Sequence, residues 1–80
     1  MKSLRLYSRQ ECHLCEDLAA ALAQVIRGRA RLEIVDIDED LDLKKRYGQR
    51  IPVLVGDGLE LSSYPLNAAA VEAYLAATDD

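Results

Sequence analysis

Hydrophobic and polar residues alternate at the start of the chain and then change to a helical spacing. Residues 3–7 alternate in this way, which predicts a strand with Leu4 and Leu6 on one face. From Cys12 onward, apolar residues recur every three or four positions, which predicts an amphipathic helix whose inner face comprises Leu14, Leu18, Leu22 and Val25. Gly28 is a natural end for this helix, since glycine readily adopts the left-handed conformation of a helix C-terminus.

The middle of the chain predicts a second strand and a short helix. Residues 32–36 are rich in β-branched side chains, which favour strands. The acidic residues 38–40 are well suited to cap a helix and occupy its first turn, because they accept hydrogen bonds from the free N–H groups there. We therefore expect a short helix over residues 41–47, ended by Gly48.

The last third of the chain predicts a hairpin followed by a helix. Strands are expected over residues 53–55 and 59–61, joined by a tight turn at residues 56–58, which read Gly-Asp-Gly. Pro65 suits the first turn of a helix, where its missing N–H is no loss, so we expect the last helix to start there. The predicted element order is β-α-β-α-β-β-α.

This order defines the fold class that we expect. A strand–helix–strand unit of about 30 residues favours a parallel pair with a right-handed crossover. The tight turn near the end makes the last two strands antiparallel. We therefore expect a single α/β domain over residues 1–80, with a four-stranded mixed sheet flanked by helices.

Charge and composition exclude several classes of partner. The formal net charge is −4, which argues against nucleic acid as the main partner, because phosphate binding needs a basic stripe. No apolar run approaches the roughly 18 residues that a membrane span requires. The sequence shows no secretory leader, so we expect a cytoplasmic protein. Structural disulfides are rare in the cytosol, so the two cysteines are expected to be reactive or metal-binding.

The pair Cys12 and Cys15 is the main candidate for chemistry. A Cys-X-X-Cys motif between a strand and a helix is typical of redox sites. The helix N-terminus favours a thiolate, so the pKa of Cys12 should be lowered and Cys12 should attack disulfides. Cys15, one turn further, should resolve the mixed disulfide. His13 is the only histidine, and it either tunes the Cys12 pKa by its charge or points to solvent.

Two other classes of function stay open at this stage. Cys12, His13 and Cys15 can bind zinc or an iron–sulfur cluster, but a zinc site normally has four protein ligands, so a second chain would be needed. The domain can also be a non-catalytic binding module that keeps the fold without turnover. We favour disulfide exchange, with no bound metal or other cofactor.

Two stretches of the sequence resemble the glutaredoxins, and especially the short glutaredoxin-like proteins of bacteria. They are residues 6–15, Leu-Tyr-Ser-Arg-Gln-Glu-Cys-His-Leu-Cys, and residues 50–54, Arg-Ile-Pro-Val-Leu. The resemblance implies a thioredoxin-like fold and thiol–disulfide oxidoreductase activity. It also implies that Pro52 is in the cis form beside the cysteines, with the backbone of Ile51 offered to a substrate or to glutathione.

The resemblance also suggests further substrate- or glutathione-binding residues. Arg9 stands where the family has a basic residue before the motif, and Arg50 is a second candidate partner for a carboxylate. Ser62 and Ser63 stand where many glutaredoxins have a glutathione-binding stretch, although the acidic anchor of that stretch is missing. Tyr7 lies close to the motif, and Tyr7 and Tyr47 can flank a groove.

The cysteine motif and the resemblance to glutaredoxins together lead to the partners that we expect. The substrates are protein or small-molecule disulfides, and glutathione is a candidate reductant. We expect the protein to act as a monomer.

Overall fold

The computed structural model describes residues 2–77 as four strands and three α-helices. The elements in chain order are β1 (Lys2–Ser8), α1 (His13–Ile26), β2 (Ala30–Asp36), the short 3-10 helix η1 (Ile37–Glu39), α2 (Leu41–Tyr47), β3 (Val53–Gly56), β4 (Leu59–Ser62) and α3 (Ala68–Ala76). The order β-α-β-α-β-β-α that the sequence predicts is therefore confirmed.

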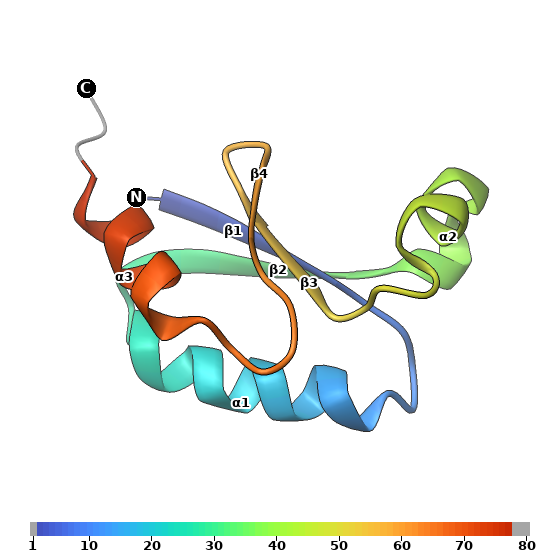
Figure 1. Cartoon of the computed structure of the whole chain (residues 1–80), viewed down its shortest axis with the longest axis horizontal. Coiled ribbons are helices and arrows are strands. Elements are labelled where there is room, and N and C mark those ends of the chain that lie inside the picture. The colour runs from blue at the N-terminus through green and yellow to red at the C-terminus, as the bar shows by residue number, and fades with distance from the viewer. Residues whose placement is uncertain (1, 78–80) are drawn as a thin grey trace.

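The four strands form one mixed sheet in the order β2-β1-β3-β4 (Figure 1). β1 pairs with β2 in parallel, with Leu6 opposite Ile34, and pairs with β3 in antiparallel, with Tyr7 opposite Val53. β3 and β4 form an antiparallel hairpin. At its tip Asp57 (φ 51°) adopts a positive φ, so this two-residue turn matches the twist of the strands. The expected four-stranded mixed sheet is confirmed.

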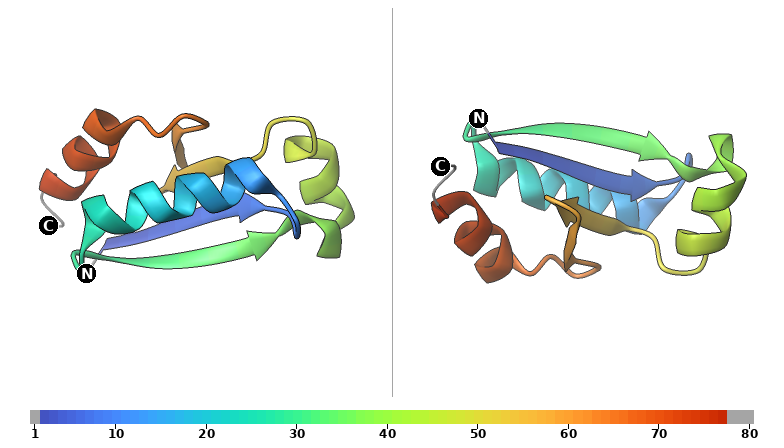
Figure 2. Two further views of the ribbon diagram at one scale, coloured as in Figure 1. Left: turned by 90° about the horizontal axis from the view of Figure 1, so that it is seen from below. Right: turned by 90° about the horizontal axis from the view of Figure 1, so that it is seen from above.

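Separate apolar cores lie on the two faces of the sheet. The core under α1 and α3 comprises Leu4, Leu6, Leu18, Leu22, Ile26, Ala30, Leu54 and Val71. The smaller core on the opposite face comprises Tyr7, Ile37, Tyr47 and Val53. Seen from above, α2 lies at one end of that second face, and no helix within residues 2–77 covers its middle (Figure 2). The sheet is therefore covered on one side and largely open on the other.

The buried face of α1 is rotated relative to the face that the sequence pattern predicts. The buried residues of the helix are Cys15, Leu18, Leu22 and Ile26. Leu14 is 44% exposed, so its expected place in the core is wrong. Because α1 begins at His13, Leu14 belongs to its first turn, whereas Cys15 is the residue of that turn that faces the sheet.

The ends of the first two helices follow local sequence signals. Arg27, with φ 36°, caps the C-terminus of α1 in the left-handed conformation, and Gly28 follows with φ 83°. The carboxylate of Asp40 caps α2 by accepting the backbone N–H groups of Asp42 and Leu43 at 2.9 and 3.2 Å. These caps position the loops that lead into and out of the sheet.

The expected start of the last helix at Pro65 is wrong. α3 begins at Ala68, and its N-cap is Asn67, whose side chain accepts the backbone N–H of Ala70 at 3.0 Å. The hydroxyl of Ser62 accepts the backbone N–H of Asn67 at 2.8 Å. This bond ties the end of β4 to the helix cap, so residues 63–66 form a closed loop instead of a helical turn.

We expect Gly56→Ala to destabilise the fold through a clash with Tyr74. A Cβ atom at Gly56 would lie 2.7 to 3.0 Å from atoms of the Tyr74 ring. That ring is held in place, because its hydroxyl donates a hydrogen bond to the Ser3 carbonyl at 2.8 Å. Overpacking of this kind costs about 1–3 kcal/mol. Thermal melting should show a lower midpoint for Gly56→Ala than for Leu59→Ala, an exposed control in the same hairpin, and equal midpoints would contradict the clash.

Candidate functional site

The sulfur of Cys12 caps the N-terminus of α1. Cys12 has extended backbone angles, φ −100° and ψ 104°, and its Sγ accepts the backbone N–H of Cys15 at 3.2 Å. The preceding residue, Glu11, has φ 59°, so the chain turns sharply just before the cap. This geometry directs a backbone N–H group and the positive end of the helix dipole at the Cys12 sulfur.

The two cysteines form a disulfide across the first turn of α1. Their Cα atoms are 5.2 Å apart. Cys15 is only 4% exposed and packs toward the sheet, while Cys12 is partly exposed at the helix end. The pair is therefore asymmetric, with one sulfur accessible and its partner buried beneath it.

His13 lies on the solvent side of the helix, among acidic residues. Its side chain is 84% exposed, and its Nε2 lies 3.5 Å from the Asp17 carboxylate, one turn further along α1. Glu11 and Glu16 are also exposed around the motif. The nearest charged partner of the His13 ring is therefore a carboxylate of its own helix.

The structure places Pro52 at the same end of the sheet as the loop to Cys12. The Ile51–Pro52 peptide bond is cis, as the resemblance implies, and the Pro52 ring is fully buried. Val53 pairs with Tyr7, so the antiparallel register carries Pro52 opposite Ser8, where the chain leaves β1 toward the cysteines.

Arg9 and Arg50, the two candidate carboxylate-binding residues, both form ion pairs within the chain. The Nε of Arg9 donates to both carboxylate oxygens of Asp38, at 3.1 and 2.9 Å. This pair ties the loop before Cys12 to η1. The guanidinium of Arg50 pairs with the carboxylate of Glu60 and also lies 5.7 Å from the centre of the Tyr47 ring.

Ile51 and Ser62, two further candidate binding residues, also have hydrogen-bond partners in the fold. The backbone N–H of Ile51 donates to the carbonyl of Tyr47 at 3.0 Å. Ser62 is buried, and its hydroxyl donates to the carbonyl of Ser63 at 2.9 Å in addition to accepting the N–H of Asn67. Ser63 itself is exposed. Sequence reasoning did not reveal these partners, because they form through the fold.

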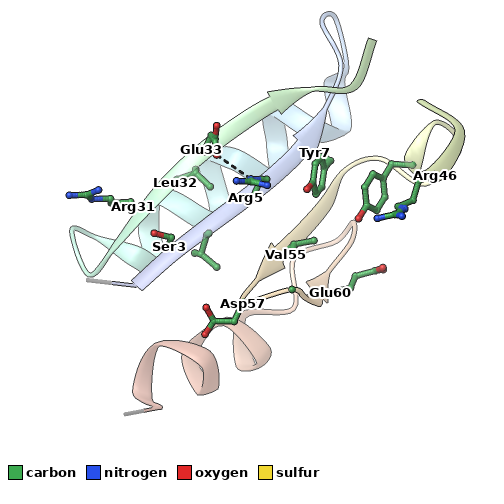
Figure 3. Close-up of a pocket in the computed structure, with 13 residues that line it drawn as sticks. Ser3, Arg5, Tyr7, Arg31, Leu32, Glu33, Arg46, Val55, Asp57 and Glu60 are labelled. Atoms are coloured by element: carbon green, nitrogen blue, oxygen red, sulfur yellow. Dashed lines mark hydrogen bonds and ion pairs between the residues drawn. The ribbon is translucent and has the colours of Figure 1, made fainter. Parts of the chain in front are cut away.

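Tyr7 lies on the sheet face opposite to α1. Its ring is 8% exposed and stacks on that of Tyr47, with centroids 4.3 Å apart. Both tyrosines line a hollow of about 740 Å³ on the open face of the sheet, which Figure 3 shows. The expectation that they flank a groove agrees with this placement, but the groove is not on the side where Cys15 packs.

Arg5 forms part of the floor of this hollow. Its pKa is raised above the ordinary value, first by a hydrogen bond with the Tyr7 side chain and then by the charge of Glu33. The Nε of Arg5 donates to the Glu33 carboxylate at 3.1 Å (Figure 3). Arg5 therefore remains a cation, partly balanced by its neighbour on β2.

A second, smaller pocket lies beside the cysteine pair, and sequence reasoning missed it. Its volume is about 160 Å³, and it is lined by Leu6, Ser8, Arg9, Cys15, Glu16, Ala19 and Ile34. Ile34 lies on the edge strand β2 and is 58% exposed. The signal available was Ile34, an aliphatic residue opposite Leu6 on an edge strand. Such a residue is also found in ordinary, partly buried strands, so it did not indicate a pocket.

Two further observations bear on metals and membranes. Within residues 2–77, no three side chains of His, Cys, Asp or Glu come together in a way that could hold a metal ion. None of the described helices has the length and apolar character needed to cross a bilayer.

The fold and the cysteine pair define a thioredoxin-like protein with a thiol oxidoreductase-type site. Residues 3–76 match the family model described as "Glutaredoxin-like domain (DUF836)". The chain belongs to this glutaredoxin-like family, which confirms the resemblance inferred from the motif.

Solved structures agree with this assignment. The crystal structure of protein XcR50 from X. campestris is 41% identical, covers 90% of this chain and 93% of its own, and has a TM-score of 0.74. A solution structure of XcR50 gives 41% identity and a TM-score of 0.72, covering 94% of this chain and 92% of that one. Comparison with curated proteins returned no match.

A more distant structure shows the fold alone. A mutant thioredoxin from Halobacterium salinarum is 22% identical, with a TM-score of 0.60, and covers 92% of this chain and 71% of its own.

Proposed function

We propose that this protein is a thiol–disulfide oxidoreductase in which Cys12 attacks and Cys15 resolves. The observation that carries the proposal is the position of the Cys12 sulfur, which caps α1 and accepts the Cys15 N–H, with Cys15 buried one turn behind. In the reduced protein, the same helix end favours the thiolate of Cys12, so we expect its pKa to be lowered. The burial of Cys15 favours its neutral thiol.

The proposed reaction transfers two electrons from the thiol pair to a disulfide. The Cys12 thiolate forms a bond with one substrate sulfur, the substrate disulfide breaks, and the departing thiolate takes a proton from water. Cys15 then loses its proton to water and attacks the Cys12 sulfur. The Cys12–Cys15 disulfide forms, and the second substrate sulfur leaves as a thiolate. A thiol reductant restores the pair.

The remaining parts of the proposal concern partners and location. The substrates are protein or small-molecule disulfides, and two classes of reductant stay open, glutathione and a protein dithiol. We propose that the protein acts in the cytoplasm as a monomer and without a bound cofactor. The Cys12–Cys15 disulfide forms within one chain, which supports the monomer.

A redox titration combined with a pH titration tests this function. We expect a reversible two-electron couple at roughly −270 to −120 mV. In the reduced protein, the midpoint pH at which the thiolate absorbance appears should lie below the ordinary cysteine pKa of about 8.5. The initial rate of disulfide attack should rise as the pH passes the lowered pKa of Cys12 and then level off. Absence of a reversible couple would overturn the proposal.

His13→Asn separates the effect of the helix from that of the histidine. The imidazole is 84% exposed and faces Asp17, so we expect this variant to change the Cys12 pKa by only a few tenths of a unit. A change of a full unit or more would instead make His13 the main source of thiolate stabilisation.

A further inference from the structure

We propose that the substrates of this site are peptide disulfides with an aliphatic side chain close to the cysteine, and that glutathione is a poor partner. The inference rests on the proposed function and concerns the substrate class of the same cysteine pair. Two independent observations carry it: the polar groups suited to glutathione have partners within the fold, and an apolar pocket lies beside Cys15.

Glutathione carries two carboxylates and net negative charge, so tight binding calls for free cations near the cysteines. Arg9 gives its Nε to both oxygens of Asp38, and Arg50 is paired with Glu60. A glutathione carboxylate would meet two arginines whose positive charge is already partly balanced by a carboxylate of the chain. These ion pairs reduce the electrostatic attraction that either arginine offers to the tripeptide.

The backbone N–H and the hydroxyl group that could bind glutathione also have hydrogen-bond partners within the chain. The N–H of Ile51, which could pair with the backbone of an extended tripeptide, donates to the Tyr47 carbonyl at 3.0 Å. The buried hydroxyl of Ser62 already donates one hydrogen bond and accepts another. Breaking such bonds without equivalent replacement leaves buried polar groups unsatisfied, which is costly.

The charges around the motif also oppose an anionic ligand. Glu11 and Glu16 are exposed next to the cysteines, and Asp17 offsets the charge of His13. Like charges a few ångströms apart repel even at the surface, where salt and water weaken the effect. An uncharged, apolar segment meets no such repulsion.

The pocket beside Cys15 supplies the attractive part of the recognition. Its aliphatic lining comes from Leu6 on β1, Ala19 on α1 and Ile34 on β2. A volume of about 160 Å³ lies below the roughly 300–1,000 Å³ of most small-molecule sites, so it suits one side chain. Ile34 is 58% exposed in the absence of a partner, so covering it with an aliphatic side chain removes apolar surface from water.

A substrate comparison with the full chain tests this inference. The probes are two disulfide-linked peptides that differ only in carrying Leu or Asp beside the cysteine, together with the glutathione mixed disulfide of the Leu peptide. Dithiothreitol, a small dithiol, regenerates the enzyme. We expect kcat/KM for the Leu peptide disulfide to exceed that of each of the other two by about tenfold, the scale on which apolar pockets discriminate.

Ile34→Thr and Leu59→Thr form a matched pair of variants. Both replace an exposed aliphatic residue of a strand, but Leu59 lies on β4 and does not line the pocket. Ile34→Thr should reduce the preference for Leu over Asp at least threefold, while Leu59→Thr leaves it unchanged. Equal rates for the three substrates, or an unchanged preference in Ile34→Thr, would overturn the inference and leave the proposed function intact. No turnover of any disulfide would overturn both.

Discussion

We expect Cys12→Ser to lower disulfide reduction to the rate measured without protein, and Cys15→Ser to stop the reaction at a covalent intermediate. Cys12 is the accessible sulfur, and its position at the cap of α1 supplies the N–H group and the dipole that favour a thiolate. A serine hydroxyl at that position cannot form the mixed disulfide. Without the Cys15 thiol, the mixed disulfide on Cys12 has no internal attacking group.

Mass spectrometry measures this difference directly. The chain contains only two cysteines, so each single variant keeps one thiol and any added mass is assigned without ambiguity. Cys15→Ser should gain one substrate thiol, released by dithiothreitol, whereas Cys12→Ser should gain none at the same pH. Cys15→Ala serves as the second variant, because a serine hydroxyl in a site that is 4% exposed can lower stability. The opposite pattern of adducts would reverse the roles of the two cysteines.

Local signals in the sequence were enough to predict the order of the elements. The alternation that puts Leu4 and Leu6 in the core follows from the two-residue period of a strand. The acidic cap at Asp40 and the turn at Asp57 depend only on neighbouring residues. Features that depend on a few adjacent residues could therefore be predicted from the chain alone.

The two incorrect local predictions both concern where a helix begins. Leu14 has the right spacing for the apolar face of α1, but the start of the helix at His13 turns Cys15 toward the sheet instead. Pro65 suits a helix start, but the bond from Asn67 to Ser62 moves that start to Ala68. In both cases, the position at which the helix is capped decides between similar local alternatives.

The candidate site could also be predicted only in part. Cys12 and Cys15 are close in sequence, so the motif was sufficient to predict their pairing. The partners of the arginines were not predictable, since Arg9 and Asp38 are 29 positions apart and nothing near Arg9 indicates which carboxylate it meets. The Ile34 pocket likewise depends on how β2 lies beside β1 and under α1. The substrate preference that we propose therefore rests on the fold more than on the motif.

Tyr47 gives the second large effect that we expect, this time on stability. Among residues 2–77, the core on the open face of the sheet has four buried residues, and the stack of Tyr47 on Tyr7 joins α2 to β1. The carbonyl of Tyr47 also accepts the N–H groups of Arg50 and Ile51, at 2.8 and 3.0 Å. Tyr47→Ala keeps that carbonyl but removes the ring, so the segment before Pro52 loses its packed support.

We expect Tyr47→Ala to lower the free energy of unfolding by about 3 kcal/mol, near the lower limit for removing a large aromatic side chain, because water can enter from the open face. Urea titration measures this change. Tyr47→Phe, which keeps the stack, should lose about 1 kcal/mol or less. Tyr64→Ala, at a position that is 43% exposed, is the exposed aromatic control and should also lose little.

The same variant separates stability from redox chemistry. The cysteines belong to α1, whose packing lies in the other core, so the midpoint potential of the folded Tyr47→Ala protein should stay close to that of the wild type. A large shift in that potential would show that the second core also sets the electrostatics at Cys12. Equal losses of stability in Tyr47→Ala and Tyr64→Ala would instead show that α2 is not held to the sheet by this stack.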